Sequence, residues 1–507
     1  DPVYDTDSTL VPLALVLDNL GTPIAGITDD INGTNRSETT PDMGAIEFSV
    51  SGSPLSGSYT VGTGGDFATI NSVGVSLLSL GVSGPVAFNI LAGTYDEPVS
   101  LGQVYGASAT NTVTFQSADA NADSVIWENT ANSSTNNYVL KLNGTDHITL
   151  KNITFKRLGT SYSQKVVLYG VTNSVTIENN TFLGYQGGNS SNHVSFYGGG
   201  ADAEDLTIKN NTFKDGGYYA IYLDSGNTSS SPTGLEISGN TITDTYGGIY
   251  AEYFDAVTIR GNTIKGSYML DKGIYLYYCD GANVVEDNSI YAPDMGYGIY
   301  LYYCQATSGN EATIVNNRIS VEDYGIYMYQ YNNYHNVYYN SVKVRDTNAL
   351  YYYSLNLNNM FKNNILYTES INNSALYVAN STGFTGDYND LYSEYIYPIY
   401  YSNGYKTLFV YQASGQGEHS VELDPVYNTD STLVPMKLLL DNLGTPIAGI
   451  TDDMNGTTRS VTTPDMGAIE FTPSSATLSG TYTVGTGGDY STLQAVRNAL
   501  VATGVSG

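Results

Sequence analysis

The chain has 507 residues and contains 54 Gly and 47 Tyr residues, but only 19 Lys and Arg residues against 49 Asp and Glu residues. Because a formal net charge of -30 repels phosphate groups, we expect no nucleic-acid partner. No run of about 18 apolar residues is available to span a bilayer, so we also expect no membrane insertion. The abundance of Gly, Asn, Ser and Thr favours a turn-rich all-β architecture.

The beginning of the chain returns near its end. DPVYDTDSTLVP at Asp1 is repeated as DPVYNTDSTLVP at Asp424, and 60 of the 84 positions in residues 1–84 are identical to those in residues 424–507. Since the copies differ elsewhere, they are successive units of one polypeptide. We therefore predict tandem modules of about 423 residues. The chain would hold the C-terminal cap of one module (1–48), a complete second module (58–471) and the start of a third (481–507).

Two short segments rich in Ser, Gly, Pro and Thr, residues 49–57 and 472–480, are predicted to be linkers between modules. Each is followed by TVGTGGD and by apolar residues at helical spacing. This pattern predicts an amphipathic helix over 66–81, with Asp66 and its copy Asp489 as N-cap residues. One such helix per module would cover the open end of a solenoid.

A short β pattern that ends in Asn recurs along the module, as in SVTIENNTF and AVTIRGNTI, at spacings of 22 to 31 residues. Asn side chains stacked at strand spacing can form a hydrogen-bonded ladder, and Asn also tolerates the left-handed conformation of a tight turn. The predicted ladder comprises Asn152, Asn180, Asn211, Asn240, Asn262, Asn288, Asn317, Asn340 and Asn364.

Between these motifs lie strands of a second kind, such as GIYL, GIYM and ALYV. If the aliphatic residue of each strand points inward, the following Tyr points outward. The resulting aromatic column would contain Tyr222, Tyr250, Tyr275, Tyr300, Tyr327, Tyr351, Tyr377 and Tyr400, with Tyr277, Tyr302 and Tyr329 beside it. Such a column can stabilise the sheet by stacking, contact a neighbouring fibre, or bind sugar rings.

Together these patterns predict an all-β fold, a right-handed parallel β-helix with a short capping helix per module and a β-rich C-terminal cap. The coils would occupy 84–384, and the last coils and the cap 385–471. A leucine-rich repeat also ends its pattern in Asn, but the chain lacks that repeat's LxxLxL motif and per-coil helix.

The segments TYTVGTGGDYSTLQAV, GVSGPVAFNILAGTYDEPVSL and GTPIAGITDDINGTNRSETTPDMGAIEF resemble the right-handed β-helix modules of very large secreted surface proteins of Bacteroidota-type bacteria. The resemblance covers nearly the whole module. It implies export by the type IX system, an extracellular or cell-surface location and an adhesin-like role.

Three further sets of residues are candidate sites. Cys279 and Cys304 lie 25 residues apart, at equivalent positions of adjacent coils, and are candidates for a disulfide or a pair of free thiols. Two loops with Asp and Asn side chains can supply oxygen ligands to Ca²⁺ or form solvated Asx-turns, and no other cofactor is expected. The loop residues are Asp29, Asp30 and Asn32, with their copies Asp452, Asp453 and Asn455; Ser8, Ser124 and Ser431 match a short glycosylation pattern.

The sequence predicts a structural or adhesive extracellular fibre of tandem modules, with neighbouring modules as end-to-end partners and other fibres or surface glycans as lateral ones. No catalytic residues are identified, and we expect no enzyme, because the outward carboxylates Asp224 and Glu252 are isolated from each other. The alternative functions are a polysaccharide-degrading β-helix enzyme, either a lyase or a glycoside hydrolase, and a glycan-binding module.

Overall fold

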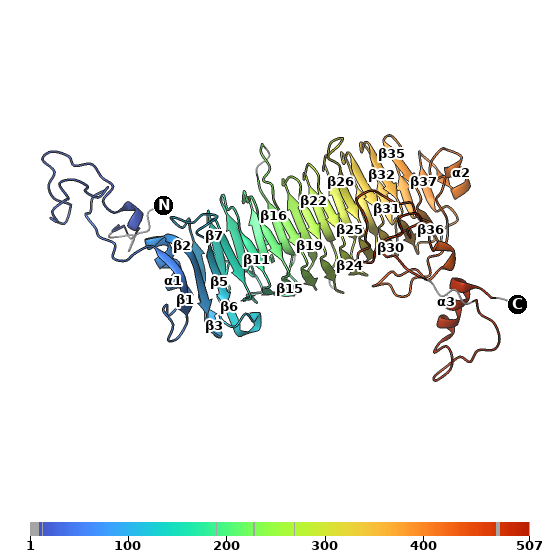
Figure 1. Cartoon of the computed structure of the whole chain (residues 1–507), viewed down its shortest axis with the longest axis horizontal. Helices are drawn as coiled ribbons and strands as arrows, with labels where there is room; N and C mark the ends of the chain where they lie inside the picture. The colour runs from blue at the N-terminus through green and yellow to red at the C-terminus, as the bar shows by residue number, and fades with distance from the viewer. Residues whose placement is uncertain are drawn as a thin grey trace. The chain divides into compact units, whose positions relative to one another are not determined.

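The computed structural model describes residues 10–12, 14–188, 190–226, 229–267, 269–472 and 477–505. It divides into a first unit, Asp1–Pro232, and a second unit, Thr233–Gly507. Both units are parallel β-solenoids in which most coils contribute one strand to each of three sheets (Figure 1). Sheet 1 contains the strand before the Asn motif, sheet 2 the strand after it, and sheet 3 the strand with the GIY motif.

In the first unit, neighbouring strands within each sheet are parallel. Sheet 1 contains β1 (Leu55–Val61), β2 (Val82–Ile90), β5 (Val113–Ser117), β8 (Ile148–Lys151), β11 (Thr176–Glu178) and β14 (Thr207–Lys209). Sheet 2 contains β3 (Gly93–Asp96), β6 (Val125–Glu128), β9 (Thr154–Lys156), β12 (Thr181–Leu183) and β15 (Thr212–Lys214). Sheet 3 contains β4 (Val99–Leu101), β7 (Leu140–Asn143), β10 (Val166–Tyr169), β13 (Phe196–Gly199) and β16 (Tyr219–Asp224).

The second unit repeats this arrangement. Sheet 1 contains β17 (Glu236–Ser238), β20 (Thr258–Arg260), β23 (Val284–Glu286), β26 (Ala312–Val315), β29 (His335–Tyr338), β32 (Asn359–Lys362) and β35 (Phe384–Asp387). Sheet 2 contains β18 (Thr241–Thr243), β21 (Thr263–Lys265), β24 (Ser289–Ala292), β27 (Arg318–Val321), β30 (Ser341–Val344), β33 (Ile365–Thr368) and β36 (Asp390–Ser393). Sheet 3 contains β19 (Gly247–Glu252), β22 (Lys272–Tyr277), β25 (Tyr297–Tyr302), β28 (Tyr324–Met328), β31 (Leu350–Tyr352), β34 (Leu376–Val378) and β37 (Ile399–Tyr401), and it ends in the antiparallel strand β38 (Tyr405–Lys406).

Successive coils align like residue with like. On sheet 3, Ile274 pairs with Ile299 and Tyr275 with Tyr300. The aliphatic residues are fully buried inside the coils, whereas most of the tyrosines beside them are only half-buried. This alternation along each strand confirms the predicted all-β parallel solenoid. The sequence did not reveal the sheet 2 strand as a separate strand. It follows the Asn directly and is only three or four residues long, so it was included in the Asn motif.

Helices are few in the described parts of both units. The first unit contains η1 (Leu15–Leu17), α1 (Ile70–Leu80), η2 (Ala122–Ser124) and η3 (Ser191–His193). The second unit contains α2 (Leu408–Gln412), η4 (Leu438–Leu440) and α3 (Leu493–Thr503). Among the described residues, no helix is long and apolar enough to cross a membrane.

The helix near the beginning of the first unit starts later than predicted. Thr69, not Asp66, is the N-cap residue of α1, because the Thr69 side chain accepts from Ser72 N in a capping box. Asp66 instead accepts hydrogen bonds from the backbone N and the hydroxyl of Thr60, both at 2.8 Å. The copy at the end of the chain differs from the prediction in the same way, since Thr492 caps α3 and Asp489 bonds to Thr483.

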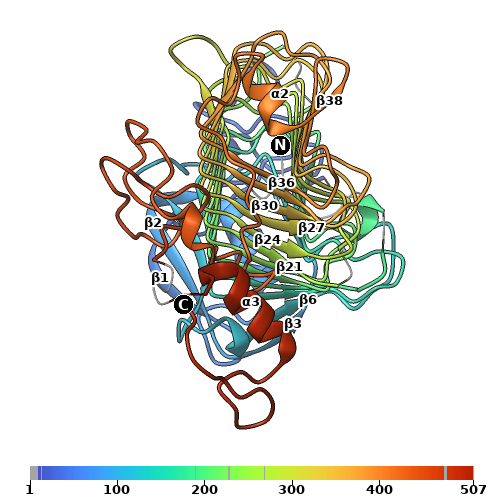
Figure 2. The ribbon, with the colours of Figure 1, turned by 90° about the vertical axis from the view of Figure 1, so that its right-hand side faces the viewer.

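The segment predicted as a β-rich cap has little regular structure. Through the described residues 413–472, the second unit contains only isolated β-bridges and η4. Its shape comes from side-chain to backbone hydrogen bonds and from packing on the coils. Residues 424–471, called the return segment below, lie outside the coils of the second unit (Figure 2). Thr445 bonds to Asn363 and Asp452 bonds to Asn316, so the segment runs back toward earlier coils.

A lysine is completely buried in the first unit. Lys165 Nζ lies 3.4 Å from Ser163 Oγ and 3.2 Å from Ser195 Oγ. Burial, with a contribution from the charge of Arg157, lowers the pKa of Lys165 to about 7. Since an unperturbed lysine has a pKa near 10.4, the unfolded chain binds one more proton at this residue than the folded chain between about pH 7 and pH 10.

The stability of the first unit should therefore rise with pH in this window, by up to about 1.4 kcal/mol per pH unit from Lys165 alone. Lys165→Met should remove this contribution, and the exposed Lys214 provides the control substitution Lys214→Met. The measurement is the urea unfolding midpoint at pH 7.5 and pH 9. An equal pH dependence in wild type and Lys165→Met would contradict the predicted role of Lys165.

Candidate functional site

Asparagine side chains form a column at the end of the sheet 1 strands. Asn317 Oδ1 accepts from the backbone N and from Nδ2 of Asn288, both at 3.0 Å. Asn317 Nδ2 donates to Val285 O at 2.8 Å and to Asn340 Oδ1 at 3.0 Å. Each buried amide is therefore bonded to the coils before and after it. The ladder contains Asn180 and Asn211 in the first unit, and Asn240, Asn262, Asn288, Asn317, Asn340, Asn364 and Asn389 in the second.

The predicted ladder requires a correction at each end. Asn152 does not belong to it, because Asn180 Oδ1 accepts from the backbone N of Ile153, which occupies the rung one residue later. Asn152 has a φ of 55° and is the residue before the rung. Asn389 belongs to the ladder but was not predicted, because the sequence NDL around it lacks the β pattern of the other coils.

The left-handed conformation belongs to the residue before each ladder position, not to the ladder residue itself. We call these residues the pre-ladder column. Asn and Gly are common there, as expected for φ near 55°, but Tyr also occurs. The column contains Asn179 and Asn210 in the first unit, and Gly239, Gly261, Asp287, Asn316, Tyr339, Asn363 and Tyr388 in the second.

Tyrosines on sheet 3 of the second unit form a continuous outward column. From Tyr300 to Tyr400, ring centroids of successive coils lie 4.3 to 4.8 Å apart and the rings are within 12° of parallel. Tyr275 interrupts this order, because its ring stands at 81° to that of Tyr300. The ammonium of Lys272 lies 4.9 Å from the Tyr275 ring centroid, within cation-π range.

Two further columns run beside the first in the second unit. Tyr277 stacks on Tyr302 at 5.1 Å between centroids and Tyr329 stacks on Tyr353 at 5.0 Å, whereas the rings of Tyr302 and Tyr329, also 5.1 Å apart, are inclined at 60°. Tyr253, Tyr278, Tyr303 and Tyr331 stack at 4.6 to 5.2 Å, and all four have φ between 50° and 57°. This last column was missed in the sequence, because tyrosine rarely takes the left-handed conformation. We call the three columns together the tyrosine face.

Parallel stacking determines what the tyrosine face presents to solvent. Where rings stack face to face at less than 5 Å, their flat surfaces are covered by each other and their edges and hydroxyls point outward. Burial raises the pKa of Tyr277 to about 12, so this hydroxyl stays protonated at neutral pH. The face therefore offers rows of neutral hydrogen-bonding groups more readily than flat rings for stacking on sugars.

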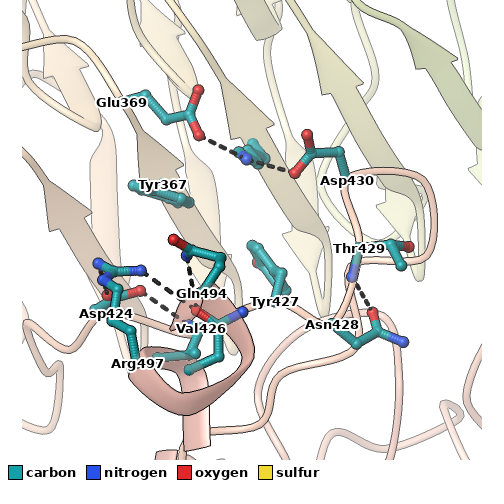
Figure 3. Close-up of a pocket in the computed structure, with 12 residues that line it drawn as sticks. Tyr367, Glu369, Asp424, Val426, Tyr427, Asn428, Thr429, Asp430, Gln494 and Arg497 are labelled. Carbon is teal, nitrogen blue, oxygen red and sulfur yellow. Dashed lines mark hydrogen bonds and ion pairs between the residues drawn. The ribbon is translucent and has the colours of Figure 1, made fainter. Parts of the chain in front are cut away.

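A polar pocket of about 360 Å³ lies in the second unit between sheet 2 and the beginning of the return segment (Figure 3). The ammonium of Lys343 is held between two carboxylates, Glu369 at 2.7 Å and Asp430 at 2.6 Å. Burial alone would lower the pKa of Lys343, but the hydrogen bonds to both carboxylates raise it. Tyr367 lines the same pocket, and burial raises the pKa of its hydroxyl. The carboxylates therefore act as partners of the lysine and tie the return segment to the coil.

The two carboxylates singled out in the sequence each accept a hydrogen bond from a residue close to them in the chain. The Glu252 carboxylate accepts a hydrogen bond from the Tyr250 hydroxyl, and Asp224 accepts one from Gly226 N at 2.8 Å. Among the described residues, no group of three or more His, Cys, Asp or Glu side chains is placed to hold a metal ion.

The Asp and Asn residues of the candidate calcium loops have structural partners. Asp453 Oδ1 accepts from the backbone N of Asn455 and of Thr457, both at 2.8 Å, and its Oδ2 accepts from Glu470 N at 2.9 Å. Asp30 makes the same three bonds in the first copy. This is the Asx-turn arrangement, one of the two interpretations of these loops in the sequence. Calcium binding stays a prediction.

Of the predicted glycosylation sites, Ser8 lies outside the described residues. Ser124 Oγ lies 2.6 Å from Asp119 Oδ1, and Ser431 Oγ lies 3.3 Å from the hydroxyl of Thr429. Modification of these serines stays a prediction.

Cys279 and Cys304 are both free and buried, so the predicted disulfide is not formed. Each thiol donates to a carbonyl oxygen of the preceding coil, Cys279 to Ala251 at 3.3 Å and Cys304 to Leu276 at 3.4 Å. Equivalent positions on parallel strands direct both side chains the same way, toward these carbonyls and not toward each other.

The two thiols should react slowly in the native protein. Burial raises the pKa of Cys279 to about 12, and that of Cys304 is raised as well. Because the thiolate is the nucleophile, alkylation at pH 8 should modify neither residue in the folded chain and both after denaturation. Mass spectrometry after iodoacetamide treatment measures this. Rapid labelling of the native chain, or only one free thiol under denaturing conditions, would contradict the prediction.

Comparison with known proteins agrees with this fold. Residues 111–264 match the family model described as right handed beta helix region, and residues 225–405 match the one described as periplasmic copper-binding protein (NosD). The chain contains a right-handed β-helix repeat. No curated protein matches the sequence.

Several solved structures are similar to the β-helix at low identity. A pectate lyase, Pel9A, is 13% identical with a TM-score of 0.39, over 83% of this chain and 97% of that one. The alginate lyase AlyGC is 12% identical with a TM-score of 0.37, over 82% and 60% of the two chains. A GH136 lacto-N-biosidase from Eubacterium ramulus is 10% identical with a TM-score of 0.33, over 67% and 68%.

These similarities correct the expectation that the chain is not an enzyme. The similar solved structures are those of a pectate lyase, an alginate lyase and a lacto-N-biosidase, so the fold gives no ground for excluding an enzyme. At 10% to 13% identity the similarities concern the fold alone, and they assign no reaction and no substrate to this chain.

Proposed function

We propose that this chain is part of an extracellular structural or adhesive fibre in which β-helix modules of about 423 residues follow one another in one polypeptide. The observation that carries the proposal is the repeated segment at both ends of the complete module, which keeps the same internal hydrogen bonds in both copies. Arg36 and its copy Arg459, for example, each lie 3.3 Å from a Glu carboxylate, that of Glu47 and Glu470 respectively.

We further propose that the fibre belongs to the very large secreted surface proteins that the sequence resembles, with export by the type IX system and an adhesin-like role. The low content of Lys and Arg and the net charge of -30 suit a protein that stays soluble as a long array and does not adhere to anionic polymers.

Electron microscopy of the native material tests the fibre directly. The proposal expects long, thin filaments with a regular axial repeat, and immunogold labelling against this chain should decorate them at equal intervals. Isolated globular particles of the mass of a single module would refute the proposal.

The tyrosine face favours a second, compatible function, the binding of a neighbouring fibre or a surface glycan through rows of hydroxyls. Binding of the purified chain to an array of polysaccharides should weaken at least tenfold in a Tyr302→Phe, Tyr329→Phe variant if the hydroxyls make the contact. Phe keeps the aromatic ring and its contacts with the neighbouring rings, so the stability should change little. Tyr169→Phe, at an exposed tyrosine in the first unit, is the matched control.

The same array of polysaccharides distinguishes binding of a polysaccharide from its cleavage. Release of unsaturated or reducing oligosaccharides from an acidic polysaccharide would favour the enzymatic alternative. If Glu369→Gln in the polar pocket abolished that release while Tyr302→Phe left it unchanged, the pocket would replace the tyrosine face as the functional site.

A further inference from the structure

Two copies of one segment occur in different surroundings in this chain. Residues 433–471 belong to the return segment and are packed on the coils of the second unit, whereas residues 10–48 precede the coils of the first unit. The two copies differ at only six positions, which correspond to Met436→Leu, Lys437→Ala, Leu439→Val, Met454→Ile, Thr458→Asn and Val461→Glu when the later copy is converted into the earlier one.

In their described residues, both copies keep the same internal hydrogen bonds. Glu47 N donates to Asp30 Oδ2 at 3.0 Å, and Glu470 N donates to the equivalent Asp453 oxygen at 2.9 Å. The guanidinium of Arg36 donates to Gly44 O at 2.8 Å, and that of Arg459 donates to Gly467 O at 2.9 Å. The earlier copy therefore holds the shape in which the later copy docks.

The later copy binds the flank of the second unit at three successive residues of the pre-ladder column. Arg459 Nη2 donates to Asn316 Oδ1 at 2.9 Å, and its guanidinium lies 4.0 Å from the ring centroid of Tyr339. Tyr339 donates its hydroxyl hydrogen to Thr445 O at 2.7 Å. Asn363 bonds to Thr445 in both directions, with its Nδ2 2.8 Å from Thr445 O and its Oδ1 2.9 Å from Thr445 N.

Apolar residues complete this contact. Met466 and Ala468 are fully buried, and Ala468 N donates to Ser341 Oγ at 2.9 Å. Ile447 and Ile450 are partly buried against a cluster of Val315, Tyr338 and Tyr339.

The same residues are uncovered in the earlier copy. Met43, equivalent to Met466, is 58% exposed, and Ile24, equivalent to Ile447, is 66% exposed. Ile24 and Met43 line the same surface pocket, and an ordered segment that presents large exposed apolar side chains together has the features of an interaction surface.

We propose that residues 10–48 are a docking element whose partner is the flank of a second copy of this β-helix, bound as residues 433–471 bind the flank at Asn316, Tyr339 and Asn363. Arg36 takes the place of Arg459 and Met43 that of Met466. The proposal rests on the tandem arrangement of the proposed function, but it is tested by contacts at one flank and does not require filaments.

The first experiment transplants the earlier copy. The six substitutions given above convert residues 433–471 of the full chain into the sequence of residues 10–48. We expect the amides of Thr445, Gly467 and Ala468, which bond to the flank in the later copy, to keep wild-type hydrogen-exchange protection. Arg459→Ala is the comparison variant and should lose most of this protection. A transplanted chain that exchanges as fast as Arg459→Ala would overturn the proposal.

The second experiment lets two copies meet. In the full chain with Arg459→Ala and Met466→Asp, the return segment should leave its flank, and residues 10–48 of another molecule should bind there. Sedimentation velocity should then show head-to-tail association, with the mass at least doubled. The experiment needs salt of about 0.15 M or more, because the net charge of -30 opposes association.

Adding Arg36→Ala and Met43→Asp to the same chain should restore the monomer. A monomer whose Thr445 and Ala468 amides exchange freely, although Arg36 and Met43 are intact, would refute the docking element. If Arg459→Ala and Met466→Asp leave the Thr445 and Ala468 amides protected, the return segment has not left the flank, and the result of the first experiment decides for or against the proposal. If the native material forms no filaments but the transplanted segment keeps its hydrogen-exchange protection, the proposed fibre is refuted and the docking element is not.

Discussion

Asn317→Ala is expected to destabilise the second unit by about 3–5 kcal/mol. The substitution removes four hydrogen bonds, which join Asn317 to Asn288, Val285 and Asn340. It leaves the backbone N and the side-chain amide of Asn288 without this acceptor in the interior, where water is excluded. Because an unsatisfied buried polar group costs more than a hydrogen bond contributes on average, the loss exceeds that of an ordinary truncation.

The measurement combines the urea unfolding midpoint with hydrogen exchange at the amide of Asn288. Both should change in Asn317→Ala, and exchange should accelerate most in the coils on either side. Asn310→Ala, at an exposed loop position of the same unit, is the matched control and should change neither. Equal midpoints for the two variants would show that the ladder adds no stability.

Gly298→Ala is expected to cost about 2–3 kcal/mol although its backbone conformation is open to any residue. An added Cβ would lie 2.4 Å from Ile319 Cγ2 and 2.6 Å from the carbonyl oxygen of Gly325. The second contact involves the backbone of the next coil, so no side-chain movement can relieve it. Gly248, Gly273 and Gly325 meet the next coil in the same way, which explains why Gly precedes so many of the IY pairs.

The control for this prediction lies two residues away. A Cβ on Gly296 would have its nearest neighbours at 3.6 Å, an ordinary contact distance. Gly296→Ala should therefore leave the unfolding midpoint nearly unchanged, whereas Gly298→Ala should lower it clearly. A Gly298→Ala chain as stable as Gly296→Ala would refute the close approach of the coils.

The coil pattern was predictable because the same side chain recurs at the same place on each turn. Ile299 follows Ile274 after one coil, and the structure pairs the two residues directly. The exact ladder position was not predictable where a coil departs from the consensus. In the segment KNITF, Ile153 occupies the ladder position. Because Asn152 is the only Asn there, the sequence placed the ladder one residue too early.

Other features could not be predicted because they depend on contacts between distant parts of the chain. The return segment has no helical or strand periodicity, and its course depends on Arg459, Thr445 and the flank residues that bind them. The tyrosine column at Tyr278 and Tyr303 was not predicted, because tyrosine rarely takes the left-handed backbone conformation that both residues adopt. Stacking between adjacent coils, with centroids 4.8 Å apart, offsets the cost of a positive φ at these residues.

The uniform register of the coils lets the length of such a protein change in whole steps. Ile274, Ile299 and Ile326 are successive partners on one sheet. Excising the 25 residues from one such position to the next would bring together two turns whose faces already match. Gain or loss of a short run of codons would then shift the reach of the protein by about 4.8 Å while both ends keep their contacts. Insertion or loss of whole coils during evolution can therefore change the distance between the binding partners at the two ends of the protein, while the sequences of both ends stay the same.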